Sequence, residues 1–170
     1  MSLPFVWHDH HFITGVHGLD FANTIVWRHD LARRVDRIQS RGDLSGWMKA
    51  AGLAPEPSAL AQSLVSRMAI DRYFRDHDKR AWAELAGCYA QALATRPHGS
   101  LAAILHSAMA LAFSPEAGHV KVCENCGWLF IDRTRNGNKR WCTPNLCGAR
   151  TRAKRYYERV RSEVARKAPS

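Results

Sequence analysis

The sequence has no apolar run long enough to cross a membrane. Its longest nearly apolar stretch, residues 101–113, spans 13 residues and contains His106, whereas a membrane-spanning helix needs about 20 apolar residues. The first residues, MSLPFVWHDHHF, lack the basic start and apolar stretch of a signal peptide. Internal repeats and low-complexity tracts are also missing. We therefore expect a globular cytoplasmic protein without a membrane partner.

Acidic residues are scarce in the last 50 residues of this 170-residue chain. Residues 121–170 carry 13 Lys and Arg but only four Asp and Glu, whereas residues 1–120 carry 12 and 11. Nearly all of the net charge of +10 therefore lies in one segment. Such asymmetry indicates either a polyanionic partner for that segment or a solvated basic tail, and charge alone does not decide between them.

Apolar residues at helical spacing dominate the first two thirds of the sequence. We expect helices over residues 18–27, 43–52, 60–73, 82–93 and 101–112, with a short extended stretch at 10–14 and a loop at 28–42. Asp43 is the expected N-cap of its helix, and Val65 is expected on the apolar face of the helix over 60–73. Residues 114–118 form a linker-like break. We predict a mainly α chain, with a helical domain over residues 1–117 that includes a short N-terminal β element, and a second module over 118–170.

The second module shows short β patterns followed by a helix. Residues 119–122 and 128–132 are typical of strands, and Asn136-Gly137 favours a type I′ hairpin turn with residues 139–142 as the returning strand. From Gly148 to about Lys167 the pattern is helical, with a narrow apolar stripe among many arginines. We therefore expect a β-hairpin followed by a basic helix.

Four of the five cysteines lie in this module, as Cys123-x2-Cys126-x15-Cys142-x4-Cys147. Two close pairs at this separation are typical of a structural zinc site, in which four thiolates fill the tetrahedron of the ion. Disulfides would require an oxidising compartment, and the cysteine count is odd. A redox pair would normally begin a helix in a βαβ unit. We predict one structural zinc ion, and Gly127 relieves backbone crowding after the second ligand.

A module of about 45 residues has little core of its own, and a bound metal supplies much of its folding free energy. Trp128, Phe130 and Trp141 are the expected small core. Basic side chains would then project from a rigid frame toward nucleic acid. The candidates are Arg133, Arg135, Lys139 and Arg140 from the hairpin and Arg150, Arg152, Lys154 and Arg155 from the helix.

Two parts of the chain resemble a known bacterial family. The run Cys126-Gly127-Trp128-Leu129-Phe130-x-Asp132, followed by Arg140-Trp141-Cys142-x4-Cys147-Gly148-Ala149-Arg150, is similar to the CGNR zinc finger, a treble-clef-like module. Upstream, Gly18-Leu19-Asp20-Phe21-x-Asn23-Thr24 and Asp43-Leu44-x-x-Trp47-x-x-Ala50 resemble the ABATE domain that precedes the finger in that family. Ala149 stands where the family's name requires Asn. The resemblance implies a stress-linked transcription regulator whose finger binds DNA and whose ABATE domain binds a small ligand.

Three functions remain open at this point. A DNA-binding regulator is favoured by the basic frame, because a helix starting at Cys147-Gly148 fits a major groove. An RNA-binding module would use exposed aromatic residues, for which Tyr156 and Tyr157 are the candidates. A protein-docking finger is the third. An enzyme is not expected, because no nucleophile elbow, phosphate loop or zinc-protease helix is present. The cluster of His8, His10 and His11 with Asp9 is interpreted as a non-functional terminal stretch.

Polar residues interrupt an apolar stretch near the N-terminus. Asp20, Asn23 and Thr24, together with Trp27, would offer a carboxylate, an amide and a hydroxyl beside an aromatic wall to a small-molecule effector. We favour a structural interpretation, in which Asp20 caps a helix and Asn23 satisfies buried backbone groups. The ligand pocket stays the alternative, and the sequence leaves the oligomeric state open.

Overall fold

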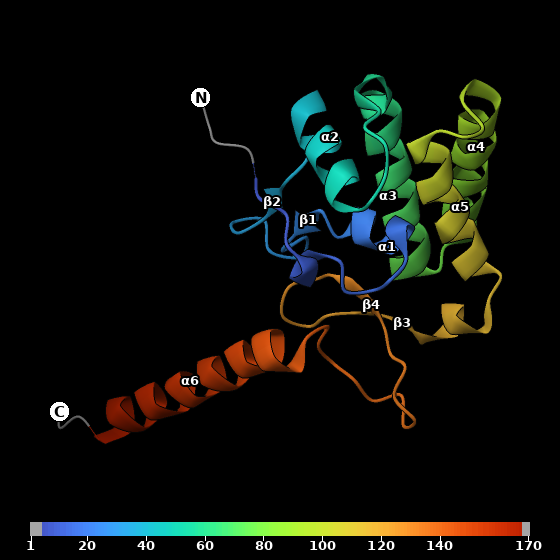
Figure 1. Ribbon diagram of the computed structural model, residues 1–170. Coiled ribbons are helices and arrows are strands. Elements are labelled where there is room, and N and C mark those ends of the chain that lie inside the picture. The colour runs from blue at the N-terminus through green and yellow to red at the C-terminus, as the bar shows by residue number, and fades with distance from the viewer. Residues whose placement is uncertain (1–4, 168–170) are drawn as a thin grey trace.

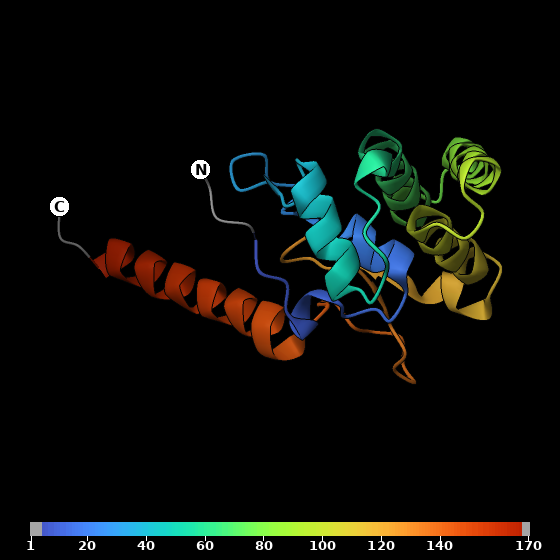
Figure 2. The same ribbon diagram turned by 45° about the horizontal axis from the view of Figure 1, so that its top comes forward.

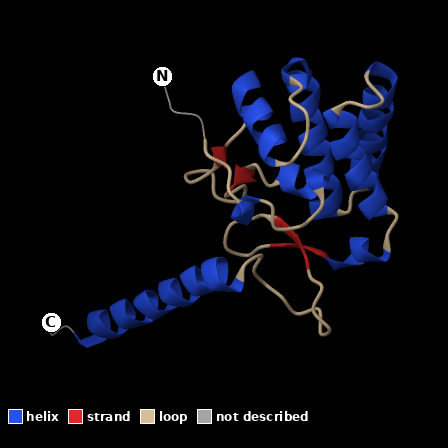
Figure 3. Cartoon of the chain, viewed as in Figure 1, coloured by secondary structure: helices blue, strands red, loops and turns tan. Residues whose placement is uncertain are grey.

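The computed structural model describes residues 5–167 and is mainly helical (Figures 1 and 3). The helices are α1 (His17–Ala22), α2 (Arg41–Ala50), α3 (Leu60–Asp76), α4 (Lys79–Thr95), α5 (Ser100–Ala112) and α6 (Ala149–Lys167). The strands are β1 (Ile25–Val26), β2 (Val35–Asp36), β3 (Val120–Val122) and β4 (Leu129–Ile131). Strand β1 pairs with β2, and β3 pairs with β4, both antiparallel. The mainly α class, the short N-terminal strands and the C-terminal hairpin with its helix are confirmed.

The core lies where the short helix α1 packs against α3 and α5 (Figures 1 and 2). Phe21, Trp47 and Phe74 are among its fully buried side chains. A Cβ added to Gly18 would lie 2.6 Å from the Cβ of Ala108, so only glycine lets α1 approach α5 this closely. The three longest helices before residue 120, α3, α4 and α5, stand side by side and support α1.

The start of α2 and the segment before α1 differ from the sequence-based expectation. Helix α2 begins at Arg41, because Ser40 is the N-cap and accepts the backbone N–H of Asp43 at 3.1 Å. Asp43 is the third residue of the helix, and its carboxylate accepts the N–H of Ser40 at 2.9 Å. This reciprocal pair is a capping box, so the prediction of Asp43 as N-cap was wrong by three residues. Residues 9–11 form a single 3-10 turn, which overlaps the start of the stretch over residues 10–14 that was predicted to be extended.

The chain leaves α1 earlier than the pattern over 18–27 predicted. Helix α1 ends at Ala22, and residues 25–26 form strand β1 instead of a further helical turn. Its partner β2 lies within residues 28–42, which were predicted to be a loop. Two-residue strands give too little alternation for a periodicity test to detect.

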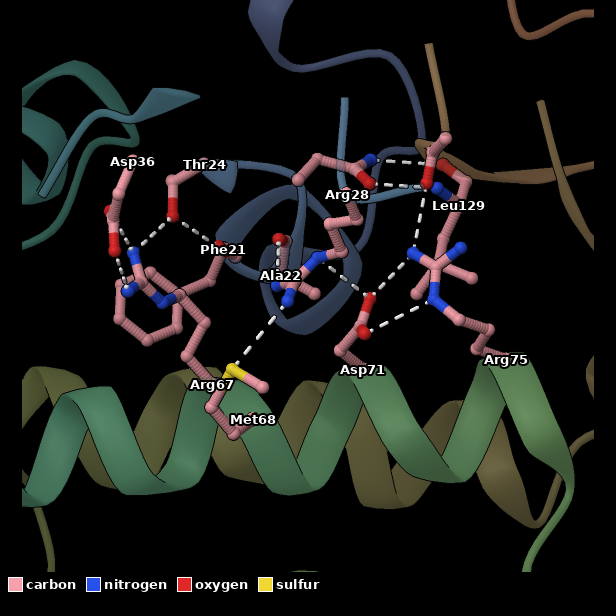
Figure 4. Close-up of polar contacts among 12 residues, drawn as sticks. Phe21, Ala22, Thr24, Arg28, Asp36, Arg67, Met68, Asp71, Arg75 and Leu129 are labelled. Atoms are coloured by element: carbon pink, nitrogen blue, oxygen red, sulfur yellow. Dashed lines mark hydrogen bonds and ion pairs between the residues drawn. The ribbon is translucent and has the colours of Figure 1, made fainter. Parts of the chain in front are cut away.

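The buried face of α3 is largely polar. Val65, expected to face the core, is 62% exposed, while Ser63, Ser66, Arg67 and Asp71 are buried. Arg67 donates two hydrogen bonds to the Asp36 carboxylate, at 2.8 and 2.6 Å, and one to the Thr24 hydroxyl at 2.9 Å (Figure 4). Burial of a charge is tolerated when it is paired in this way. Helix α3 therefore contributes ion pairs that hold the β1–β2 segment against it.

The C-terminal hairpin is not where the Asn136-Gly137 signal placed it. Strands β3 and β4 pair across the Cys123–Trp128 segment, with Val122 opposite Leu129. Gly137 has φ +55°, but Asn136 keeps a negative φ, whereas a type I′ turn requires positive φ at both positions. Residues 139–142 form no strand, and the prediction of a returning strand there was wrong. The turn at Asn136-Gly137 instead lies in the loop that leads from β4 to the second cysteine pair.

Hydrogen bonds join the two parts of the chain directly. The Asn23 side chain donates to the carbonyl of Leu129 at 2.9 Å and accepts its backbone N–H at 2.7 Å. The backbone N–H of Trp27 donates to the carbonyl of Cys126 at 2.9 Å. Arg75, anchored by Asp71 (Figure 4), donates to the carbonyl of Gly127 at 2.8 Å. The first cysteine pair is thus docked on the helical part.

Helix α6 extends away from the rest of the molecule (Figures 1 and 2). Every residue from 152 to 163 is exposed. Among the residues that the structure describes, the helix contacts chiefly the turn that precedes it, Pro144–Gly148. Its apolar stripe, including Tyr156 and Val160, is therefore solvent-facing.

Replacing Asn23 with Ala should destabilise the fold by about 2 to 4 kcal/mol, because both backbone groups of Leu129 would be left buried without a partner. Denaturant-induced unfolding, followed by circular dichroism, measures this change. Asn145→Ala, at an exposed position in the finger, is the matched control and should change stability by less than about 0.5 kcal/mol. Equal stability of the two variants would contradict the role of Asn23 in joining the C-terminal module to the helical part of the chain.

Candidate metal centre and nucleic-acid interface

The four cysteines predicted as metal ligands lie together. The sulfur atoms of Cys123, Cys126, Cys142 and Cys147 all lie within 4.8 Å of one another, and the Cys126–Cys142 and Cys142–Cys147 sulfurs are both 3.6 Å apart. A tetrahedron with Zn–S bonds of about 2.3 Å has edges of roughly 3.8 Å. None of the four is in a disulfide. The arrangement therefore suits one zinc ion held by four thiolates.

The first cysteine pair is shaped by a tight turn between β3 and β4. The backbone N–H of Gly127 donates to the carbonyl of Cys123 at 2.9 Å. Gly127 has φ +75°, and a Cβ there would lie 2.8 Å from Nδ1 of His29. The positive φ favours glycine at this position, and any larger residue would also displace the exposed ring of His29 from the N-terminal domain. The predicted role of Gly127 in relieving backbone crowding agrees with this conformation.

The second pair is presented by a wide turn at the start of α6. The carbonyl of Thr143 accepts three backbone N–H groups, from Leu146, Cys147 and Gly148, at 3.2, 2.9 and 3.3 Å. This turn brings the Cys147 sulfur back toward Cys142 and leads directly into α6. The metal site and the first turn of the helix are consequently one local structure.

Close packing of four thiols favours a cation among them. Contact with the Cys126 thiol lowers the pKa of Cys123 far below its usual range, and the same contact raises the pKa of Cys126. Four thiolates at this distance repel one another unless a divalent ion balances their charge. All four tetrahedral positions would then be filled by sulfur, so the ion would be structural. Cys88, the fifth cysteine, lies on α4 and is not part of this group.

Asp132 orders the loop between the cysteine pairs. Its fully buried carboxylate accepts hydrogen bonds from Lys121 at 2.9 Å, from the backbone N–H of Lys139 at 2.8 Å and from that of Thr134 at 3.1 Å. The Lys121 ammonium and the Thr134 hydroxyl, the latter at 2.5 Å, together hold the pKa of Asp132 well below its usual range. The loop that carries the predicted hairpin cations therefore has a fixed shape.

The predicted nucleic-acid residues fall into two groups. Arg133 and Arg140 are each held by a carboxylate, Glu116 and Glu124 respectively, at 2.6 Å. Lys139 is half-buried, with its ammonium 6.0 Å from the centre of the Phe130 ring. The remaining members, Arg135, Arg150, Arg152, Lys154 and Arg155, are exposed, and of these only Lys154 has a carboxylate partner among the described residues, Glu158 at 3.8 Å. The structure thus separates the arginines that are paired with a carboxylate from a group of unpaired arginines that lies mostly on α6.

Arg159 and Arg161 join that α6 group and were not among the predicted residues. Both are exposed, and neither forms an ion pair within the described part of the chain. Their positions continue the spacing of the helix, so extending the pattern by two turns would have found them. Arg37, which lines a cavity near the cysteines, gave no comparable signal because it lies in a segment without periodicity.

The four residues predicted as a ligand site are not brought together. Asn23 and Thr24 are buried and engaged by Leu129 and Arg67. Asp20 does not cap α1, whose N-cap is Val16, and so that prediction was wrong. Its carboxylate instead accepts the backbone N–H of Thr14 at 3.1 Å. Burial raises the pKa of Asp20 to about 6, although the hydrogen bonds from Thr14 oppose the shift.

Trp27 lies apart from the other three, beside the cysteines. It lines the same cavity as Cys126 and Cys147. Its φ is +58°, a conformation that is strained for a bulky residue. The N-terminal histidines approach this cavity as well, and burial lowers the pKa of His11 to about 4. In the part of the chain that the structure describes, the histidine cluster does not gather enough ligand atoms for a metal site.

Comparison with protein families agrees with this arrangement. The family model of the ABATE domain, described as "Putative stress-induced transcription regulator", matches residues 15–119. The chain belongs to the ABATE family. The CGNR zinc finger matches residues 119–160, directly after the ABATE domain. Searches of curated proteins and of solved structures found no match. The ABATE-CGNR order predicted from the sequence is confirmed, and the joint at Asn23 is a contact between these two domains.

The structure also bears on the membrane prediction. Over residues 5–167, no helix combines the length and the apolar character that a membrane span requires. The longest helix, α6, is strongly basic, and the most apolar one, α5, has only 13 residues.

Replacing Cys142 with Ser should remove the metal, because three thiolates hold zinc far more weakly than four. Elemental analysis of the purified protein should fall from about one zinc per chain to well below one. The melting temperature should drop by roughly 10 to 20 °C if the metal contributes about 5 kcal/mol. Cys88→Ser is the matched control and should keep its zinc; loss of zinc in both variants would contradict the assignment.

Asp20→Asn should stabilise the ABATE domain at pH 8 by about 1 to 3 kcal/mol. The raised pKa of Asp20 means that the folded state favours the protonated form, so the ionised carboxylate is destabilising above pH 6. The gain should shrink as the pH falls from 6 toward 4, because the folded wild type takes up its proton near pH 6 and the unfolded chain near pH 4, and the energetic difference between ionised and protonated Asp20 disappears below the lower value. Denaturant unfolding at pH 8 and pH 4 measures this, with the exposed Asp76→Asn as control. A gain independent of pH would contradict it.

Proposed function

We propose that this ABATE-CGNR chain is a non-enzymatic, DNA-binding transcription regulator of the cytoplasm, and that its ABATE domain senses a small ligand. The observation that carries the proposal is the basic helix α6, which is exposed along residues 152–163. Within residues 5–167, its arginines at 150, 152, 155, 159 and 161 form no ion pair. Cations kept free of carboxylates are available to phosphates.

The dimensions of α6 fit a duplex. A helix of 19 residues is about 28 Å long, and the major groove of B-DNA admits a single helix. Arg152, Arg155 and Arg159 follow one another at spacings of three and four, so they lie on one face. The zinc site would fix the start of this helix, and the docked ABATE domain would fix the zinc site.

Phosphate contacts make binding sensitive to salt, because each one releases a condensed counterion. A triple variant, R152A/R155A/R159A, should lower the slope of log K against log salt by about 3 and weaken binding. Fluorescence anisotropy with a labelled duplex, over a series of salt concentrations, measures both effects. The matched control is R41A/K49A/R80A, which removes three exposed cations from the ABATE domain and should leave the slope nearly unchanged.

Two outcomes would overturn the DNA proposal. One is wild-type protein without salt-sensitive binding to duplex DNA at low ionic strength. The other is an equal loss in the two triple variants, which would assign the binding to net charge instead of α6.

RNA is the second candidate, supported by the exposure of Tyr156 and Tyr157, at 55% and 71%. Aromatic residues beside arginines can stack on unpaired bases. Competition distinguishes the two nucleic acids: a structured RNA with single-stranded loops, added to a DNA complex, would displace the protein at a lower concentration than unlabelled duplex if RNA were preferred. Stable binding to a protein without affinity for either nucleic acid would instead favour a docking finger.

A further inference from the structure

A cavity of about 440 Å³ lies at the junction of the ABATE domain and the finger. Trp27 and Arg37 line it from the ABATE side, and Trp128, Leu146 and Arg150 from the finger side. Cavities of this size are typical of small-molecule sites, which often lie between domains. The predicted ligand residues Asp20, Asn23 and Thr24 do not line it, whereas Trp27 does.

Arg37 is unusual among the arginines buried in the ABATE domain. Arg28, Arg67 and Arg75 each pair with a carboxylate, at 3.2, 2.6 and 2.7 Å. The half-buried Arg37 guanidinium has no carboxylate and no hydrogen bond within residues 5–167, and its Nη1 is buried without a partner. A buried guanidinium without an acceptor loses the hydration that a partner would replace.

Aromatic rings hold this guanidinium in place. It lies 4.3 Å from the ring centre of Phe5 and 5.7 Å from that of Trp128, distances that fit cation–π contacts. Arg150, on the first turn of α6, lines the same cavity and also has no ion pair within the described residues. Two arginines thus contribute to one cavity, and no carboxylate lines it.

Aromatic side chains form much of the apolar lining of the cavity, and one of them, Trp27, has a strained backbone conformation. Trp27 keeps a positive φ, held by its hydrogen bond to Cys126 and by the Arg33 guanidinium 4.1 Å from its ring centre. Strained backbone at a bulky residue persists only when its surroundings enforce it, and such positions cluster at ligand sites. Trp128 lines the cavity as well, and its indole Nε1 is buried without an acceptor.

We propose that this cavity binds a small aromatic carboxylate, with the acid group between Arg37 and Arg150 and the ring against Trp27 and Trp128. The planar guanidinium matches a carboxylate in a bidentate pair, and the flat ring matches the aromatic lining. The inference rests on the ligand-sensing part of the proposed function and names the ligand class. It does not depend on DNA binding, so it is tested in the absence of nucleic acid.

The zinc site offers a competing explanation for the two arginines. Four thiolates with one Zn²⁺ carry a formal charge of −2, and Arg37 lies near the Cys126 thiolate. If the two arginines served only to balance the negative charge of the zinc site, their removal would weaken zinc retention and no organic acid would bind. The experiment therefore measures zinc content alongside ligand binding.

The test uses full-length, zinc-loaded protein with benzoate and 1-naphthoate as probes, and with benzamide and inorganic phosphate as matched controls. At about 100 times Kd, the aromatic acids should raise the melting temperature by roughly 5 to 10 °C. Benzamide, which lacks the charge, and phosphate, which lacks the ring, should each shift it far less. R37Q and R150Q should each raise Kd at least tenfold in isothermal titration while keeping their zinc. R34Q and R80Q, which replace exposed arginines outside the lining, should leave Kd unchanged.

Three results would overturn the inference. The first is the absence of stabilisation by either aromatic acid. The second is equal stabilisation by benzamide or phosphate, which would exclude an aromatic carboxylate as the class. The third is loss of zinc from R37Q and R150Q without any measurable ligand binding by the wild type, which would assign both arginines to the metal. Since no nucleic acid is present, these results leave the DNA proposal to its own experiment.

Discussion

The docking of the first cysteine pair on the ABATE domain determines where the rest of the finger lies. Asn23 binds both backbone groups of Leu129, and Trp27 donates to the carbonyl of Cys126. Both contacts are made to backbone, so they hold the position of the turn without depending on the side chains around it. Helix α6 begins at the second cysteine pair, and its direction therefore depends on the metal and, through the metal, on α1.

Charge is distributed unevenly across this contact between the two domains. In the ABATE domain, three arginines that pack against its interior are paired: Arg67 with Asp36, and Arg28 and Arg75 with Asp71. On α6 the arginines face solvent without acidic partners among the described residues. Exposed ion pairs contribute little to stability, so the unpaired state of the α6 arginines costs the fold almost nothing. It leaves the helix strongly positive, which favours attraction to a polyanion over a long range.

The metal centre could be predicted from sequence because its information is local. Two short cysteine spacings specify the ligands. The long helices α3, α4 and α5 can be predicted in the same way, from the helical spacing of their apolar residues. The C-terminal hairpin could not be placed by the same means, because Asn136-Gly137 is a strong local turn signal while the actual β3–β4 pairing is set by the metal-binding turn between them.

The polar face of α3 and the junction cavity were beyond prediction for a different reason. Arg67 and Asp71 are buried only because Asp36, Thr24 and Arg28 reach them from a segment that has no periodicity of its own. The same segment supplies Arg37, whose significance depends on having no carboxylate nearby, a property that only the three-dimensional arrangement reveals.

The turn formed by residues 144–148 has a consequence for the helix that follows it. Starting a helix is the unfavourable step, since the first turn fixes several residues for a single hydrogen bond, whereas each later residue adds one bond of its own. In this protein the first turn is fixed by Thr143 and by the metal ligand Cys147. Helix α6 needs no tertiary contacts along residues 152–163, because its nucleus is already formed and only propagation remains. Loss of the metal would therefore lower the helicity of a segment that the metal does not touch.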